Sequence, residues 1–242
     1  MHSVSTSFPV GSQSLAGTFA IPETGVPGVL FLHGWSGSQD SDLKRAKDIA
    51  ALGCLCFTFD LRGHAKTEGL RDRVTPRENF EDALAAYDQL VSHPMVDRSS
   101  IAVIGSSYGA YLAPLLSAVR PVRWMSLRVP ALYRDQHWER PKGKLDRTDL
   151  TMFRDQALAP AENRALAACA DFRGDVLVIE SERDDYIPHP TIANYVTAFR
   201  KVRSLTYRVI EGADHGLSEP HMRRAYTDLL TGWIREMVLG AR

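Results

Sequence analysis

The sequence has little cysteine, no excess of charge of either sign and no long apolar run. Its 242 residues include three cysteines, and two of them, Cys54 and Cys56, lie two positions apart on a predicted strand. Residues at that spacing point to the same face of a strand, which predicts a packing role. There is no C-x-x-C pair and no Cys/His cluster with zinc-ligand spacing. We therefore expect a reducing, cytoplasmic setting, no metal and no other cofactor.

The balance of charge excludes two classes of partner. Lys and Arg together number 29, as do Asp and Glu, so the chain has no general attraction to nucleic acid or to an anionic membrane. No stretch approaches the roughly 18 consecutive apolar residues of a membrane span. Residues 1–9 lack both a basic segment and an apolar run, so no signal peptide is expected. A small-molecule partner remains, and the sequence does not specify an oligomeric state.

Strands and helices alternate along most of the chain. Predicted strands cover residues 28–33, 54–59, 101–104, 122–129, 175–180 and 204–210, and predicted helices cover residues 40–52, 75–92, 108–119, 161–170, 190–200 and 219–238. This alternation predicts an α/β fold with a mostly parallel twisted sheet and helices on both faces. Residues 4–21 read as an antiparallel hairpin, and the pattern breaks at residues 22–25. The length fits a single domain, 1–242, with a small cap inserted at about 130–160.

The most informative stretch is Gly105-Ser-Ser-Tyr-Gly109, which lies between a buried strand and a helix. It matches G-x-S-x-G, a motif that presents a serine on a sharp strand-to-helix turn. Only small neighbours tolerate the crowded backbone of such a turn, which explains Gly105 and Gly109. Ser107, between the two glycines, is thus a candidate nucleophile. A glycine-rich connecting turn without chemistry is the alternative that this motif alone leaves open.

A serine hydroxyl needs a general base, and a histidine serves best when an acid orients it. Four histidines follow Ser107, but only His215 lies in a glycine-flanked loop directly after a strand. The acid is expected on the loop after the preceding strand, since parallel strands end at one edge of the sheet. Chemistry alone leaves two choices there, Asp184 and Asp185. Asp214 is adjacent to His215 and is expected to shape its turn.

With these residues in view, the chain resembles the α/β-hydrolase superfamily, in particular its dienelactone-hydrolase-like and small-esterase members. The resemblance covers essentially the whole chain and rests on the segments His33-Gly-Trp35, Asp60-Leu-Arg-Gly-His64, Gly105-Ser-Ser-Tyr-Gly109, Ser181-Glu-Arg-Asp-Asp-Tyr-Ile-Pro188 and Gly212-Ala-Asp-His215. It implies Asp184 as the acid, although Ser181 replaces the usual glycine of that loop. Dienelactone hydrolases proper use cysteine as the nucleophile, and Ser107 departs from them.

The resemblance also implies an oxyanion hole. The N–H of Tyr108, the residue after the nucleophile, is one expected donor, and the N–H of Trp35 is the second. His33, Asp60 and Arg62 are expected to have structural roles.

The cap supplies the expected substrate pocket. Trp35, Tyr133 and Trp138 are its expected apolar wall. The cap has six basic and five acidic residues, and this near balance argues against a dedicated phosphate-binding site. We therefore expect a serine hydrolase that cleaves carboxylic esters of small to medium acyl or aryl groups. A peptidase, thioesterase or lactonase with the same residues, or a non-catalytic ligand-binding protein of this fold, are the alternatives.

Overall fold

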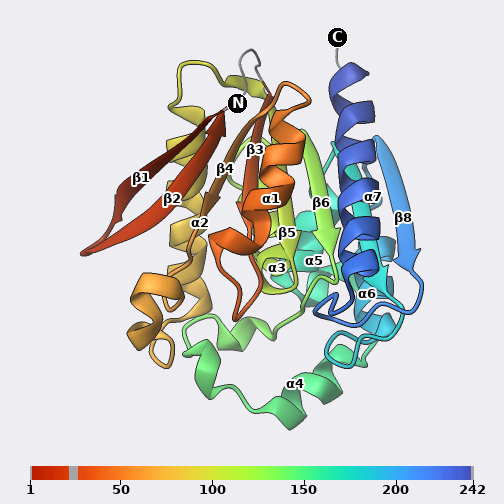
Figure 1. Cartoon of the computed structure of the whole chain (residues 1–242). Coiled ribbons are helices and arrows are strands. Elements are labelled where there is room, and N and C mark those ends of the chain that lie inside the picture. Colours follow the sequence, from red (N-terminus) through yellow and green to blue (C-terminus); the bar gives the residue numbers. More distant parts are fainter. Residues whose placement is uncertain (1, 22–26, 241–242) are drawn as a thin grey trace.

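An eight-stranded sheet forms the centre of the molecule in the computed structural model, which describes residues 2–21 and 27–240 (Figure 1). The strands lie in the order β1-β2-β4-β3-β5-β6-β7-β8. The pairs β1–β2 and β2–β4 are antiparallel, whereas every pair from β4 to β8 is parallel. The predicted fold class, including the N-terminal antiparallel hairpin, is confirmed. The predicted break at residues 22–25 lies outside the described residues.

The bounds of the elements are as follows. The strands are β1 (His2–Val10), β2 (Gln13–Ile21), β3 (Pro27–Leu32), β4 (Leu55–Phe59), β5 (Asp97–Ser106), β6 (Trp124–Arg128), β7 (Asp175–Ser181) and β8 (Ser204–Ile210). The α-helices are α1 (Gln39–Ala50), α2 (Pro76–Val91), α3 (Tyr108–Ser117), α4 (Arg147–Arg154), α5 (Arg164–Asp171), α6 (His189–Ala198) and α7 (Pro220–Leu239). Short 3-10 helices are η1 (Ala65–Leu70), η2 (Asp135–His137), η3 (Lys142–Lys144) and η4 (Pro160–Glu162).

Both faces of the sheet are buried under helices. Side chains alternate between the two faces of a strand, and in β3 Val29 and Phe31 join one core cluster while Leu30 and Leu32 join the other. The first cluster includes residues of α1 and α7, and the second includes residues of α2, α3, α5 and α6. Figure 1 shows α1 and α7 in front of the sheet. Burial on both faces explains why the central strands read as continuous apolar runs.

The start of α2 shows how closely local sequence determines an element. Thr75 accepts a hydrogen bond from the backbone N–H of Glu78, the Glu78 carboxylate accepts one from the Thr75 N–H, and Pro76 is the first helical residue. This reciprocal cap satisfies two backbone donors that the first helical turn leaves unpaired. A cap of this kind stabilises a helix by about 1 kcal/mol.

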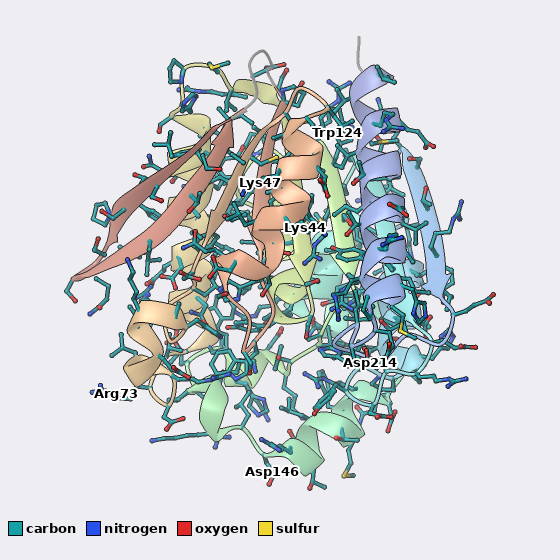
Figure 2. All side chains as sticks on the ribbon, in the orientation of Figure 1. Lys44, Lys47, Arg73, Trp124, Asp146 and Asp214 are labelled. Carbon is teal, nitrogen blue, oxygen red and sulfur yellow. The ribbon has the colours of Figure 1, made fainter. Side chains whose placement is uncertain are left out.

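The inserted cap crosses the carboxyl ends of the central strands (Figure 1). Residues 130–160 contain η2, η3 and α4. Figure 2 marks the two ends of the sheet: Asp146 of the cap and Asp214 after β8 lie at one end, and Trp124 at the start of β6 lies at the other. The cap thus covers the edge at which the candidate loops meet.

The largest differences from the sequence prediction are at β5, at α5 and in residues 65–70. Strand β5 begins at Asp97 and not at 101, because its first residues are polar and give no apolar signal. The helix predicted from 161 begins at Arg164, where the Asn163 side chain caps it. Residues 65–70, predicted as loop, form η1. None of the described helices is both long enough and apolar enough to cross a membrane.

Candidate active site

Ser107 lies at the turn between β5 and α3, in a conformation that few side chains adopt. Its φ is 51° and its ψ is −108°. Non-glycine residues at such angles carry strain of order 1–3 kcal/mol, so surrounding contacts must hold them. Those contacts include three backbone hydrogen bonds: the Ser107 N–H donates to the Arg128 carbonyl at 2.9 Å, and the Ser107 carbonyl accepts from the N–H groups of Ala131 at 3.1 Å and Tyr111 at 3.2 Å. The end of β6 and the residues that follow it therefore hold the Ser107 turn in place.

The two glycines of the motif are required by space. A Cβ on Gly105 would lie 2.6 Å from the Cα of Ala110, and a Cβ on Gly109 would overlap the carbonyl oxygen of Leu32 in β3. Helix α3 can therefore begin directly against the sheet only with glycine at both positions. The spacing G-x-S-x-G here reflects the close approach of helix and strands.

His215 and Asp184 form a hydrogen-bonded pair. The His215 Nδ1–H donates to Asp184 Oδ2 at 2.7 Å, and Asp184 Oδ1 accepts from the backbone N–H groups of Tyr186 and Ile187 at 2.8 Å each. The Asp184 side chain is only 2% exposed. The Asp184 carboxylate thus accepts three hydrogen bonds, and the bond from Nδ1–H fixes the orientation of the imidazole. The second ring nitrogen, Nε2, is then an acceptor.

The structure separates the acids that the sequence left open. Asp185 is exposed, and no hydrogen bond of its side chain is found within the described part of the chain. Asp214 accepts from the Ser218 N–H at 2.8 Å and shapes the turn, as expected. Glu180 accepts from Tyr207 and contacts His189. Only Asp184 therefore contacts His215.

The loops after β7 and β8 are joined through their backbones. The Arg183 N–H donates to the Ala213 carbonyl at 2.8 Å, and the Glu182 N–H donates to the Ile210 carbonyl at 3.2 Å. The Glu182 carboxylate in turn accepts from the Gly212 N–H at 2.6 Å. These bonds fix the loop that holds the acid against the loop that holds the histidine, so the pair does not depend on one side-chain contact.

The loop after β3 lies against the turn of Ser107. A Cβ on Gly34 would lie 3.4 Å from the Cβ of Ser107, so the backbone of this loop is in close contact with the turn. The next residue, Trp35, and the first residue of α3, Tyr108, have aromatic rings 5.5 Å apart in an edge-to-face arrangement. The two residues expected to donate N–H groups to an oxyanion are thus neighbours beside Ser107.

His33 stabilises this loop through hydrogen bonds, which is a structural role. Its Nε2 accepts from the Leu61 N–H at 3.1 Å, and its Nδ1–H donates to the Gly34 carbonyl at 2.8 Å. Burial lowers the pKa of His33, and burial together with the neighbouring His33 lowers the pKa of His64 to about 4. Both rings are therefore neutral at pH 7 and pack together, at 4.8 Å between centroids.

A buried polar network that the sequence did not indicate supports Tyr108. The Tyr108 hydroxyl donates to Asn79 Oδ1 at 3.0 Å, and the Asn79 amide donates to Asp82 Oδ2 at 3.1 Å. Asp82 also pairs with Arg62, with Nε and Oδ1 2.5 Å apart. Burial raises the pKa of Asp82 to about 6 although Arg62 opposes that shift. Arg62 thus has the structural role expected of it. The network connects the start of α3 to α2, which contains Asn79 and Asp82.

Arg128, the last residue of β6, connects the segments that hold the three candidate residues. Its side chain donates two N–H bonds to the His215 carbonyl, both at 3.0 Å, and one from Nε to Ser106 Oγ at 3.1 Å. Its carbonyl accepts from Ser107, as described above. Arg128 is 7% exposed, and burial lowers its pKa. The sequence analysis missed this residue because its partner His215 is 87 positions away.

The expected apolar wall is assembled only in part. Tyr133 packs edge-to-face on Tyr108, with ring centroids 5.7 Å apart, and so lies near Trp35. Trp138 instead packs on Phe80, at 5.6 Å, and under the guanidinium of Arg164, at 4.4 Å. The structure does not bring Trp138 to the other two, because η2 turns the chain toward α2.

Within residues 2–21 and 27–240, no group of three or more His, Cys, Asp or Glu side chains is arranged to hold a metal ion. A polar cavity of about 260 Å³ lies beside the Trp35 loop, and its lining includes Ser36, His64 and Arg71. The residues expected at the site offer a serine hydroxyl, a carboxylate-oriented imidazole and backbone N–H donors.

Comparison with known proteins extends these observations. A family model described as "Alpha/beta hydrolase family" matches residues 29–229. An uncharacterized Mycobacterium tuberculosis protein is 29% identical over 217 residues, which cover 88% of this chain and 72% of that protein. An uncharacterized 31.7 kDa Escherichia coli protein is 29% identical over 101 residues, which cover 40% of this chain and about a third (35%) of the relative.

Solved structures show the same fold. A dienelactone hydrolase from Anabaena variabilis aligns with a TM-score of 0.69 and 21% identity, covering 96% of both chains. An acylaminoacyl peptidase from Pyrococcus horikoshii aligns with a TM-score of 0.72 and 17% identity, covering 97% of this chain and 41% of that one. At these identities the likeness concerns the fold.

Proposed function

The chain belongs to the alpha/beta hydrolase family, and from that premise we propose that it is a serine hydrolase that cleaves carboxylic esters through Ser107, His215 and Asp184. The observation that carries the proposal is the His215–Asp184 hydrogen bond of 2.7 Å, with the His215 loop tied by Arg128 to the turn of Ser107. Membership of the family supports hydrolase activity. The three residues supply the nucleophile, the base and the acid that ester hydrolysis needs.

In the proposed acylation, Ser107 is the nucleophile and His215 is the base. His215 Nε2 accepts the proton of Ser107 Oγ while that oxygen attacks the ester carbonyl carbon. The carbonyl oxygen becomes an oxyanion and accepts hydrogen bonds from the N–H groups of Trp35 and Tyr108. Collapse of this intermediate breaks the bond to the alcohol oxygen, which leaves with the proton from His215. The acyl group stays on Ser107 as an ester.

Deacylation repeats these steps with water. His215 accepts a proton from a water molecule as its oxygen attacks the acyl carbon, and it returns the proton to Ser107 Oγ when the acid product leaves. Asp184 remains ionised and stabilises the imidazolium in both halves. Each oxyanion donor of this kind contributes roughly a 100- to 1000-fold rate increase, so Trp35 and Tyr108 are a main part of the mechanism.

A substrate panel tests the reaction class. We expect p-nitrophenyl acetate and butyrate to be hydrolysed with saturation kinetics and an initial burst of p-nitrophenol, since an acyl-enzyme accumulates. The matched N-acetylalanine p-nitroanilide, a phenyl thioacetate and a γ-lactone probe the peptidase, thioesterase and lactonase alternatives. Faster turnover of one of these, relative to its uncatalysed rate, would replace the ester assignment and keep the mechanism. A protein that turns over none of them is better described as a ligand-binding member of the family.

Substitution of Arg128 tests how the histidine is positioned. Arg128→Met removes both N–H donors to the His215 carbonyl, and we expect kcat to fall about 10- to 100-fold with little change in KM, because a small misplacement of the base slows proton transfer. Arg128→Lys keeps one donor and is expected to restore part of kcat. Thermal melting curves of both variants separate this effect from unfolding. A fall in KM and kcat together, without rescue by Lys, would argue against a positioning role.

A further inference from the structure

The ammonium group of Lys142, in η3 of the cap, lies against three aromatic side chains near Ser107. Its Nζ lies 3.9 Å from the ring centroid of Trp35, 5.1 Å from that of Tyr108 and 5.4 Å from that of Tyr133. Two of these three residues are the proposed oxyanion donors. The backbone holds the segment in place, since the Lys142 N–H donates to the Val74 carbonyl at 3.0 Å. The lysine is therefore directed at the substrate side of the site by the fold of the cap.

Two further cations flank Lys142. The Arg71 guanidinium lies 5.3 Å from the Trp35 ring centroid, and the Arg154 guanidinium lies 5.2 Å from the Tyr133 ring centroid. Arg154 also donates to the Tyr186 carbonyl at 3.1 Å, and the Tyr186 ring lies 5.2 Å from that of His215. The rim of the site thus alternates cations and aromatic rings from the Trp35 loop to the His215 loop.

Arg71 pairs with the Glu68 carboxylate at 3.6 Å, but no carboxylate pairs with Lys142 or Arg154 in the described part of the chain. Among the described residues, none lies within 4.0 Å of a side-chain nitrogen of Lys142 or Arg154. Burial, followed by Arg154 and Arg71, lowers the pKa of Lys142 well below its ordinary value. An ammonium group in such surroundings is destabilised until an anion pairs with it.

Four of the five acidic residues of the cap are engaged elsewhere. Asp135 pairs with Arg164 at 3.2 Å, Glu139 with Arg77 at 2.9 Å, and Asp149 with Arg134 at 3.0 Å. The Asp146 carboxylate caps α4. The near balance of charge along residues 130–160 does not reveal this arrangement. The fold engages these acids away from the site and leaves Lys142 and Arg154 without a carboxylate partner among the residues that the structure describes.

We propose that Lys142 binds a carboxylate carried by the acyl part of the substrate, so that the preferred substrates are half-esters of dicarboxylic acids. The proposal rests on the proposed function. The acyl part is the one concerned because β3 and β7–β8 lie on opposite sides of β5. The oxyanion loop after β3 faces the acyl carbonyl, whereas His215 after β8 faces the leaving alcohol. Lys142 lies on the side of the oxyanion loop, against Trp35.

Matched ester pairs test this proposal. The mono-p-nitrophenyl esters of glutaric and adipic acid carry the carboxylate, and their methyl-capped diesters have nearly the same shape without the charge. We expect the wild-type protein to prefer the half-esters by about tenfold or more in kcat/KM, since a charge-assisted hydrogen bond is worth that much. Added KCl is expected to reduce the preference by screening. Uncatalysed hydrolysis is measured separately and subtracted.

Variants of the cap locate the effect. Lys142→Met keeps the apolar stem and is expected to lower the half-ester preference about tenfold, while Lys142→Arg retains most of it. Lys144→Met, an exposed lysine of the same η3 segment, is the control and should leave the preference unchanged. Thermal melting establishes that each variant folds. Equal changes in Lys142→Met and Lys144→Met, or a wild-type preference near one, would overturn the proposal.

Failure of this proposal is distinguishable from failure of the proposed function. Ser107-dependent hydrolysis of the neutral diesters with no half-ester preference overturns only the role of Lys142. If no ester is hydrolysed, calorimetric titration with monomethyl adipate still decides it: tighter binding by wild type than by Lys142→Met supports the carboxylate site, and equal binding overturns it.

Discussion

Replacement of Ser107 by alanine is expected to lower kcat for p-nitrophenyl butyrate by about 10⁴-fold or more, because no other hydroxyl can form the acyl-enzyme. Ser107 alone has the strained φ of 51° at the turn between β5 and α3. Removal of Oγ leaves the backbone N–H donors in place, so weak binding and a small residual rate are expected to persist. Steady-state kinetics over at least five decades of enzyme activity measure the effect.

The adjacent serine provides the control for that variant. Ser106→Ala removes only a hydroxyl that accepts from Arg128 Nε, and its activity is expected to stay within about tenfold of wild type, as for a lost hydrogen bond of ordinary strength. If Ser106→Ala lost as much activity as Ser107→Ala, the assignment of the nucleophile within Gly105-Ser-Ser-Tyr-Gly109 would be wrong.

Replacement of Asp184 by asparagine has the second large expected effect. The amide places an NH₂ or a weaker acceptor opposite His215 Nδ1, where the carboxylate now accepts at 2.7 Å. The imidazole then favours the tautomer with its proton on Nε2, which cannot accept the proton of Ser107. We expect kcat to fall about 10³- to 10⁴-fold with little change in KM. Initial rates over a substrate series give both constants.

Asp185→Asn is the matched control, because Asp185 is the next residue and is exposed. Its kinetics should be close to those of wild type. The reverse result, with Asp185→Asn inactive and Asp184→Asn active, would contradict the pairing of Asp184 with His215 as the functional one. Circular dichroism of both variants shows whether the loop hydrogen bonds from Tyr186 and Ile187 survive the change.

Local features of the sequence were sufficient to predict the fold and the sharp turn at Ser107. The alternation of apolar strands with helices predicted the parallel sheet, because both faces of β3 and β5 are buried and their apolar runs are continuous. The glycines at 105 and 109 predicted the turn, since α3 approaches the strands too closely for a Cβ. The capping pattern at Thr75 predicted the start of α2 for a similar reason: it depends on neighbours within one helical turn.

Adjacent loop residues and long-range partners could not be predicted in the same way. Asp184 and Asp185 are chemically identical neighbours, so chemistry alone left both open and the family resemblance implied Asp184; in the structure, the turn that donates two N–H groups to Asp184 distinguishes them. Arg128 gave no signal because its partner, His215, lies in a loop after β8. The cap has little periodicity, so the sequence placed Trp138 beside the site and did not indicate Lys142, whereas the fold does the opposite.

The central claim is that Ser107 forms a covalent acyl-enzyme, and mass spectrometry of the trapped intermediate tests it most directly. The protein is mixed with p-nitrophenyl butyrate, quenched in acid during the burst, digested and analysed by peptide sequencing in the mass spectrometer. We expect a butyryl group on Ser107 in the wild type and none in Ser107→Ala. A burst without an adduct on Ser107, or a butyryl group on Ser106 or another residue, would contradict it.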